Sequence, residues 1–380
     1  TGFGPFVAVY LTTQKWTQSE IGLILSIGGI VGLIGQMPGG AIINAARSER
    51  LVAGLAVATI GVSALAYAAW PIFPVIALAA ILHAAASCVL GPVIAAISLG
   101  LVGPRAIGER LGRNARFASL GNGVAAGVMG VVGYLVSSRA VFVVSFAFAG
   151  ATLLALARIR DREIDPEQAH GAIARVEPDP DATSVVHLLH QRPLVIFACT
   201  VFLLQFANAA MLPLMAGIVT ERSSEGAPAL IALCIIVPQA IVALISPSVG
   251  RKAQAWGRRP LLMIAFVALA VRGLLFATVH DPSLLVVVQV LDGVTAAVFG
   301  VMIPLIVADV AFGSGHFNLA QGVIGTATGI GASLSTVVAG TMSDHFGHGV
   351  AFTGLAAAAL SGLLVVWTLM PETRPAGLPR

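Results

Sequence analysis

The chain has 380 residues, of which 57% are hydrophobic and 10% charged, and its mean hydropathy is +0.95. Charged residues make up roughly a quarter of an ordinary soluble domain, so this composition excludes one and indicates that lipid is the main solvent. The net charge of +4 comes from cations in short gaps between apolar segments, with no basic groove. This pattern argues against a nucleic-acid partner.

Apolar segments long enough to cross a membrane follow one another along the whole chain. A span needs roughly 20 residues, whereas barrel strands have about ten residues of alternating polarity. The sequence therefore predicts an all-α membrane protein with twelve transmembrane helices, of which the first is short enough that we expect its N-terminal part to be missing. The predicted spans are 1–11 (partial), 21–43, 51–70, 74–102, 116–136, 141–157, 194–219, 229–249, 260–279, 284–308, 321–342 and 350–370.

The cations give the orientation. Seventeen of the 21 Lys and Arg residues lie in alternate gaps, at 44–50, 103–116, 158–193, 250–259 and after 370. Positively charged loops stay on the cytoplasmic side during insertion. We therefore expect a multi-pass protein of the inner (plasma) membrane with both termini in the cytoplasm.

The segment 158–193 is the only long polar stretch, and it predicts a cytoplasmic linker between two six-helix bundles, 1–157 and 194–380. Its end at 183–192 is either a short interfacial helix or part of a solvated linker. Traces of an internal repeat support the division into halves. At an offset of 209, Leu82, His83, Gly91 and Ile97 fall on Leu291, Asp292, Gly300 and Ile306.

Two charged loops carry a family resemblance. The loop after span two reads Gly40-Ala-Ile-Ile-Asn44-Ala-Ala-Arg47-Ser-Glu-Arg50, and the loop after span eight begins at Gly250 and keeps Gly257 with a basic pair. With twelve spans and a central linker, the chain resembles the major facilitator superfamily, whose loop reads Gly-x-x-x-Asp-(Arg/Lys)-x-Gly-(Arg/Lys)-(Arg/Lys). The resemblance implies two bundles that rock about a central site, which is alternating access.

Asn44 stands where that family has an aspartate that takes part in closing the cytoplasmic side. An amide cannot supply the charge, so we expect Asn44 to weaken the outward-open state and favour an inward-open one. The alternative is that Glu49 or Glu109 supplies the pairing. The residues to which we assign gating are Gly40, Asn44, Arg47, Arg50 and Arg113.

Arg272 and Asp292 lie deep in spans nine and ten, at matching depth. Charges at such depth are costly and are functional candidates by default. They form either a structural ion pair or a proton-coupling site, and coupling would require Arg272 to move away, because an aspartate held by arginine stays ionised. His83, at the repeat-related position, is either a second proton-exchanging group or a packing residue.

In span seven, Gln205 and Asn208 share a helical face with Met211, and Phe202 and Phe206 lie nearby. Such a mixture suits an organic ligand of modest polarity, although amides also bond neighbouring helices to each other. The further substrate-binding candidates are Gln36, Gln239 and Gln289.

Met211 and Met215, one turn apart, offer thioethers that suit copper(I), but methionines at this spacing usually fill a core. No nucleotide motif, zinc spacing or cluster of catalytic groups appears in the spans. The sequence predicts no cofactor, no enzyme, and a monomer whose partners are protons, lipids and a small solute. We expect proton-coupled efflux of a small organic molecule, with proton-coupled import of a nutrient or metal chelate as the alternative.

Overall fold

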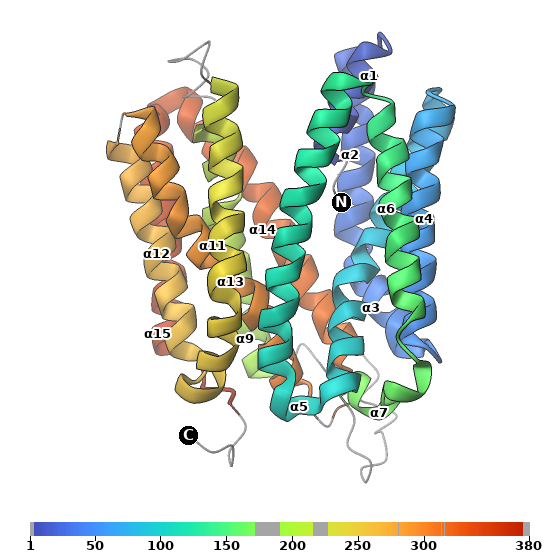
Figure 1. The fold of residues 1–380 in the computed structure, drawn as a ribbon. Helices are drawn as coiled ribbons and strands as arrows, with labels where there is room; N and C mark the ends of the chain where they lie inside the picture. Colours follow the sequence, from blue (N-terminus) through green and yellow to red (C-terminus); the bar gives the residue numbers. More distant parts are fainter. Residues whose placement is uncertain are drawn as a thin grey trace. The chain divides into compact units, whose positions relative to one another are not determined.

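The computed structural model describes residues 4–171, 191–215, 227–279, 281–312, 314 and 316–374 (Figure 1). Every regular element in these ranges is a helix. A helix satisfies its backbone hydrogen bonds internally, which is what a segment crossing lipid requires. The all-α prediction is confirmed, whereas the segment 183–192 lies outside the described residues apart from its last two.

The helices follow the predicted spans closely. Among the described residues each apolar segment is helical, although 21–43 is divided between α2 and α3 and two segments share α5. In chain order the elements are α1 (Gly4–Thr13), α2 (Gln18–Ile34), α3 (Gln36–Ala45), α4 (Glu49–Ala69), α5 (Phe73–Leu135), α6 (Ala140–Ala157), η1 (Asp161–Glu163), α7 (Pro166–Ala169), α9 (Arg192–Asn208), α11 (Ala227–Trp256), α12 (Arg259–Thr278), α13 (Pro282–Val310), α14 (Phe317–Phe346) and α15 (His348–Thr368).

Helix α5 contains two predicted spans. A straight helix of its 63 residues would be about 95 Å long, three times the thickness of a bilayer core. Its dihedral angles leave the helical region at Gly103, where φ is 70° and ψ is 175°. The single break at Gly103 therefore divides α5 into two lengths that each suit one crossing.

Among the described residues, nine helices are long and apolar enough to cross a membrane. The pair α2 and α3, bent by 50° near Gly35, makes a tenth candidate, and dividing α5 at Gly103 makes an eleventh. Helix α1 has ten residues and coincides with the short first segment. The chain is a multi-pass membrane protein, and the count of twelve stays a prediction.

Contacts between residues divide the chain into two compact units. Unit 1 comprises Thr1–Gly103, Gly121–Glu177 and Gly313–Gly325, and unit 2 comprises Pro104–Leu120, Pro178–Phe312 and Thr326–Arg380. Two short segments thus group with the half opposite to the one that holds them in the sequence. The boundaries predicted from the sequence, 1–157 and 194–380, stay a prediction.

Glycine explains the grouping of these two segments. In unit 2 a Cβ atom at Gly112 would lie 2.6 Å from the carbonyl oxygen of Ser246, and in unit 1 a Cβ at Gly322 would lie 2.7 Å from that of Gln36. Such distances leave no room for a side chain. Small residues at these positions let the helix backbones approach each other.

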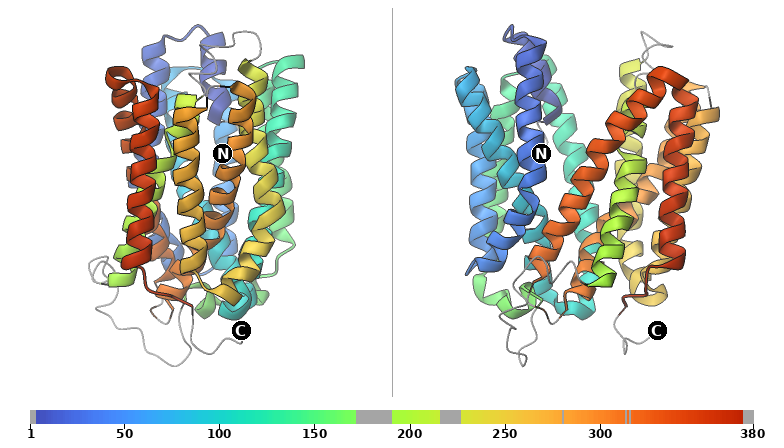
Figure 2. Two further views of the ribbon diagram at one scale, coloured as in Figure 1. Left: turned by 90° about the vertical axis from the view of Figure 1, so that its left-hand side faces the viewer. Right: turned by 180° about the vertical axis from the view of Figure 1, so that it is seen from behind.

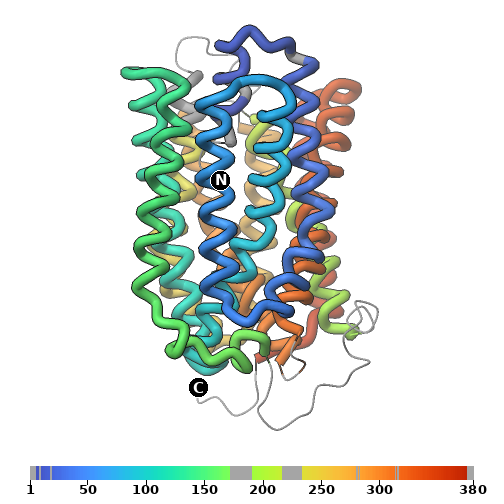
Figure 3. Tube along the Cα trace, turned by 90° about the vertical axis from the view of Figure 1, so that its right-hand side faces the viewer, coloured from blue at the N-terminus to red at the C-terminus, as the bar shows by residue number. Residues whose placement is uncertain are grey.

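Unit 1 has an aromatic core. The ring of Phe142 on α6 stacks on Tyr67 of α4 with centroids 5.2 Å apart and meets Tyr10 of α1 edge-on at 4.9 Å. The Tyr10 hydroxyl donates to the carbonyl oxygen of Tyr67 at 2.9 Å, so its polar group is satisfied inside the apolar cluster. Figure 3 shows α4 and α6 side by side in this unit.

Unit 2 is built around α12 and α13. Helix α12 packs on α13 and α15, α11 packs on α13, and α9 packs on α15, as the views in Figure 2 show. A Cβ atom at Gly293 would lie 2.5 Å from Cβ of Ile241, which keeps α13 close to α11. This packing also brings α9 into contact with both α12 and α13.

We predict that Gly103→Ala destabilises the protein. The dihedral angles of Gly103 belong to a region that is essentially restricted to glycine, and an added Cβ would lie 2.8 Å from Oε1 of Gln168. The cost should be about 1–3 kcal/mol, measurable as a lowered thermal midpoint in detergent. Gly91→Ala on the same helix, where nothing lies within 4 Å, is the control, and equal midpoints for both variants would contradict the prediction.

Candidate transport site and gate loops

Three helices of unit 2 place polar side chains around one buried arginine. The Nη1 atom of Arg272 on α12 donates to Oδ1 of Asn208 at 2.6 Å and to Oδ1 of Asp292 on α13 at 2.7 Å. The side chain of Arg272 is 1% exposed and that of Asp292 is 20% exposed. Arg272 and Asp292 thus form an ion pair, as their matching depths indicated, and whether its role is structural or proton-coupling stays a prediction. Asn208 is a third member that the sequence did not link to it.

The surroundings of Arg272 compensate for part of the cost of burying its charge. Besides the two oxygens, the guanidinium lies over the ring of Phe276, 5.2 Å from its centroid, a favourable cation–π arrangement. The buried Nε atom has no hydrogen-bond partner among the described residues. Removing one partner of a buried ion pair leaves a charge without compensation and is strongly destabilising.

The predicted ligand face of α9 packs closely against other helices. Phe202 and Phe206 stack with centroids 6.0 Å apart, and a Cβ at Gly331 of α14 would lie 3.2 Å from Cβ of Gln205. Met211 and Met215 are 0% and 1% exposed. These two methionines fill the core, and the described residues contain no group of three or more His, Cys, Asp or Glu side chains that would hold a metal.

The remaining predicted site residues do not form one cluster, although Gln289 lies one helical turn before Asp292 on α13. Gln289 of α13 is fully buried beside Cys234, and Gln239 of α11 accepts from the hydroxyl of Ser119 through its backbone oxygen at 2.8 Å. In unit 1, Gln36 donates to the carbonyl oxygen of Gly32 at 3.0 Å. His83 is partly buried on α5 of the same unit. Their roles in transport stay predictions.

Four of the five predicted gating residues lie around the junction of α3 and α4, and the fifth, Arg113, lies on α5. Gly40 is buried, and a Cβ at this position would collide with the backbone oxygen of Asn318. The Oδ1 atom of Asn44 is buried without a hydrogen-bond partner among the described residues, whereas Arg47 is exposed. At the position of the family's aspartate, the amide oxygen of Asn44 therefore accepts no hydrogen bond from the described residues.

The two acidic residues named as alternative partners differ in burial. Glu49 is 3% exposed, and its Oε1 lies 3.4 Å from Nε2 of His170, just after α7. Glu109 lies 4.0 Å from Arg113 one helical turn away, and both side chains are more than half exposed. An exposed pair contributes little to stability. Which of the two acids compensates for Asn44 stays a prediction.

The loop between α11 and α12 is held by charge. Arg258 is 1% exposed, and it donates from Nε to Oδ2 of Asp309 at 2.8 Å and from Nη2 to Oδ1 at 3.1 Å. The backbone nitrogen of Arg258 donates to Glu372 at 2.9 Å, and the Thr373 hydroxyl donates to Asp309. This cluster was not predicted from the sequence, because Arg258 looks like one more topology signal. The acidic residues at the end of α13 and just after α15 were the available signal.

Comparison with known proteins identifies the family. The profile described as Major Facilitator Superfamily matches residues 1–251 and 223–379, essentially the whole chain. The chain belongs to the major facilitator superfamily. An uncharacterised MFS-type transporter of Mycobacterium tuberculosis, found in two strains, is 38% identical over 379 residues, which is 98% of this chain and 90% of the relative.

Solved structures of this superfamily share the fold. The proton:xylose symporter XylE matches with a TM-score of 0.75 and 15% identity, over 98% of this chain and 92% of XylE. The nucleoside transporter NupG matches with a TM-score of 0.65 and 16% identity, over 97% and 96% of the two chains. At such identities the likeness shows the fold alone. As a superfamily member the chain is a transporter rather than an enzyme.

We predict that Arg272→Met destabilises this transporter by up to about 3–5 kcal/mol, because the largely enclosed carboxylate of Asp292 loses its counter-charge. The double variant Arg272→Met/Asp292→Asn should recover most of that loss, since the remaining groups are neutral. Thermal unfolding in detergent measures all three stabilities. Arg113→Met, which breaks an exposed pair, should change stability by at most about 1 kcal/mol. A double variant as unstable as the single one would contradict this explanation.

Proposed function

We propose that the protein is a secondary transporter that exports a small organic molecule in exchange for protons by alternating access. The observation that carries the proposal is the Arg272 cluster, in which one guanidinium has two alternative acceptors at 2.6 and 2.7 Å. If Asp292 takes up a proton, Asn208 still accepts from Arg272. The neutral amide thus lowers the cost of separating the ion pair, and separation is what a proton carrier needs.

The exposure of Asp292 supports a role in proton uptake. Its side chain is 20% exposed, whereas that of Asp309, in the other buried pair of unit 2, is 6% exposed and held by two guanidinium nitrogens. Asp292 contacts a single nitrogen. A partly exposed, singly held carboxylate is better suited to exchange a proton than one that is enclosed.

Import is the second candidate. Among the proteins that share the fold, XylE is a proton:xylose symporter and NupG is a nucleoside transporter. Proton-coupled uptake of a polar nutrient or a metal chelate would use the same Asp292. The distinction depends on whether protons and solute move in opposite directions or together.

The direction of the pH gradient that drives uptake decides between exchange and symport. Proteoliposomes with an acidic lumen should accumulate ethidium, used as a probe of aromatic solutes, because protons leave as the dye enters. This sign does not depend on the orientation of insertion. Accumulation of xylose or uridine with an alkaline lumen, and none of ethidium with an acidic one, would contradict export.

The same assay tests Asp292. Asp292→Asn should reduce gradient-driven accumulation by at least about ten-fold while leaving counterflow of loaded solute measurable, because the amide cannot carry the proton. Asp344→Asn, the same change at an exposed carboxylate near the end of α14, is the matched control and should retain full activity. Undiminished gradient-driven uptake by Asp292→Asn would remove this residue from proton coupling.

We further propose that Asn44 shifts the conformational equilibrium towards the inward-open state. Spin labels at Ser137 and Ser283, both exposed on predicted extracytoplasmic turns, should report longer distances in Asn44→Asp than in the parent. The restored carboxylate supplies the charge that closes the cytoplasmic side. If Glu49 already supplies it, Asn44→Asp will leave the distances unchanged and Glu49→Gln will shorten them.

A further inference from the structure

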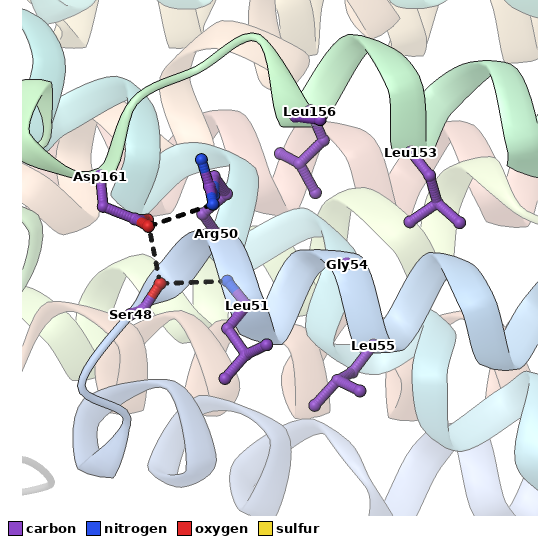
Figure 4. A pocket seen from close by; sticks show the side chains of 9 residues that line it. Ser48, Arg50, Leu51, Gly54, Leu55, Leu153, Leu156 and Asp161 are labelled. Carbon is purple, nitrogen blue, oxygen red and sulfur yellow. Dashed lines mark hydrogen bonds and ion pairs between the residues drawn. The ribbon is translucent and has the colours of Figure 1, made fainter.

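A surface groove between α4 and α6 of unit 1 combines a polar end with an apolar wall. It has a volume of about 430 Å³, and Figure 4 shows the polar side chains gathered where the two helices approach the η1 segment. The side chains that define it are Ser48, Arg50, Leu51, Leu55, Leu156 and Asp161.

The wall of the groove is apolar and exposed. Leu51 and Leu55 are 63% and 60% exposed although they belong to a helix that crosses the membrane. Between the helices lies Gly54, and a Cβ there would be 3.7 Å from Cδ2 of Leu156, an ordinary contact distance. The absent side chain of Gly54 leaves a furrow rather than a tight helix contact.

The polar end presents a half-exposed arginine. Arg50 lies 3.2 Å from Asp161 through Nη2 and donates to the carbonyl oxygen of Ile159 at 2.6 Å through Nη1. A guanidinium has five N–H donors, and these contacts use two of them. Ser48 donates to the other oxygen of Asp161 at 3.1 Å, so the carboxylate is already well supplied with donors.

The charge around this end is positive. Within two residues of the groove residues lie four further arginines, all exposed, against the exposed acids Asp161 and Glu163 and the buried Glu49. The four are Arg47, Arg158, Arg160 and Arg162. By the positive-inside rule this end lies at the cytoplasmic leaflet, whose anionic lipids attract such clusters.

We propose that the groove binds one anionic phospholipid of the cytoplasmic leaflet, with its phosphate on Arg50 and one acyl chain along Leu51, Leu55 and Leu156. Charge-assisted hydrogen bonds from a guanidinium to a phosphate are strong and directional. The furrow over Gly54 leaves space between the helices in which the acyl chain can lie. The site is independent of the solute and the direction of transport.

Native mass spectrometry of the full chain in detergent, with added phosphatidylglycerol or phosphatidylcholine of identical acyl chains, tests the site. The protein should retain phosphatidylglycerol at least about ten-fold more tightly than phosphatidylcholine. Arg50→Gln should remove this preference by loss of the phosphate contact. Gly54→Leu should weaken binding of both lipids, because the new side chain fills the furrow.

Asp161→Asn distinguishes an anionic from a zwitterionic ligand. Loss of its negative charge at the mouth should raise affinity for phosphatidylglycerol, whereas a lipid held through an ammonium group on Asp161 would bind less tightly. The controls are Arg251→Gln, at an exposed arginine of α11 that does not belong to this cluster, and Gly22→Leu, at an exposed position of α2 with nothing within 4 Å. Equal retention of the two lipids by the parent, or binding unchanged in both Arg50→Gln and Gly54→Leu, would overturn the assignment.

Discussion

A guanidinium group taken out of water has to find acceptors within the protein, and this requirement organises unit 2. Arg258 and Arg272 are each 1% exposed, and each is paired with a carboxylate of α13, Asp309 and Asp292. Those carboxylates are separated by 17 residues, or about 25 Å along the helix. Helices α12 and α13 are therefore tied by charge at two levels across most of a bilayer core.

The corresponding position in unit 1 is filled differently. In the two charged loops, aligned at Gly40 and Gly250, Ser48 stands where unit 2 has Arg258. Instead of an enclosed bidentate pair, unit 1 has Arg50 against the half-exposed Asp161 and Glu49 beside His170. The loop of unit 1 is thus open to solvent and to lipid headgroups in a way that the Arg258 cluster is not. Of these two arginines, an external anion has access to Arg50 alone.

The features that could be predicted from the sequence are those that depend on the lipid surroundings of the chain. Apolar length gave the positions of the helices, and depth along neighbouring spans paired Arg272 with Asp292. It could not predict that Asn208 completes the cluster, because that contact depends on how α9 packs. Just after α15, Glu372 accepts from the backbone nitrogen of Arg258, and Thr373 donates to Asp309. His170 reaches Glu49 from the segment 158–193, which was predicted to be a linker. Contacts between residues far apart in the chain leave no local sequence pattern from which they could be predicted.

The two buried pairs of unit 2 suit different tasks, although each joins an arginine to an aspartate. Asp309 is held by two nitrogens of Arg258 and by Thr373, so releasing it would break three hydrogen bonds. Asp292 is held by one nitrogen, and Arg272 keeps Asn208 at 2.6 Å when that bond opens. The cost of a single separation is consequently lower at Asp292. A pair that opens at low cost, such as Arg272–Asp292, suits a group that changes partners during a transport cycle. The Arg258–Asp309 pair costs more to open and therefore suits a permanent contact between helices.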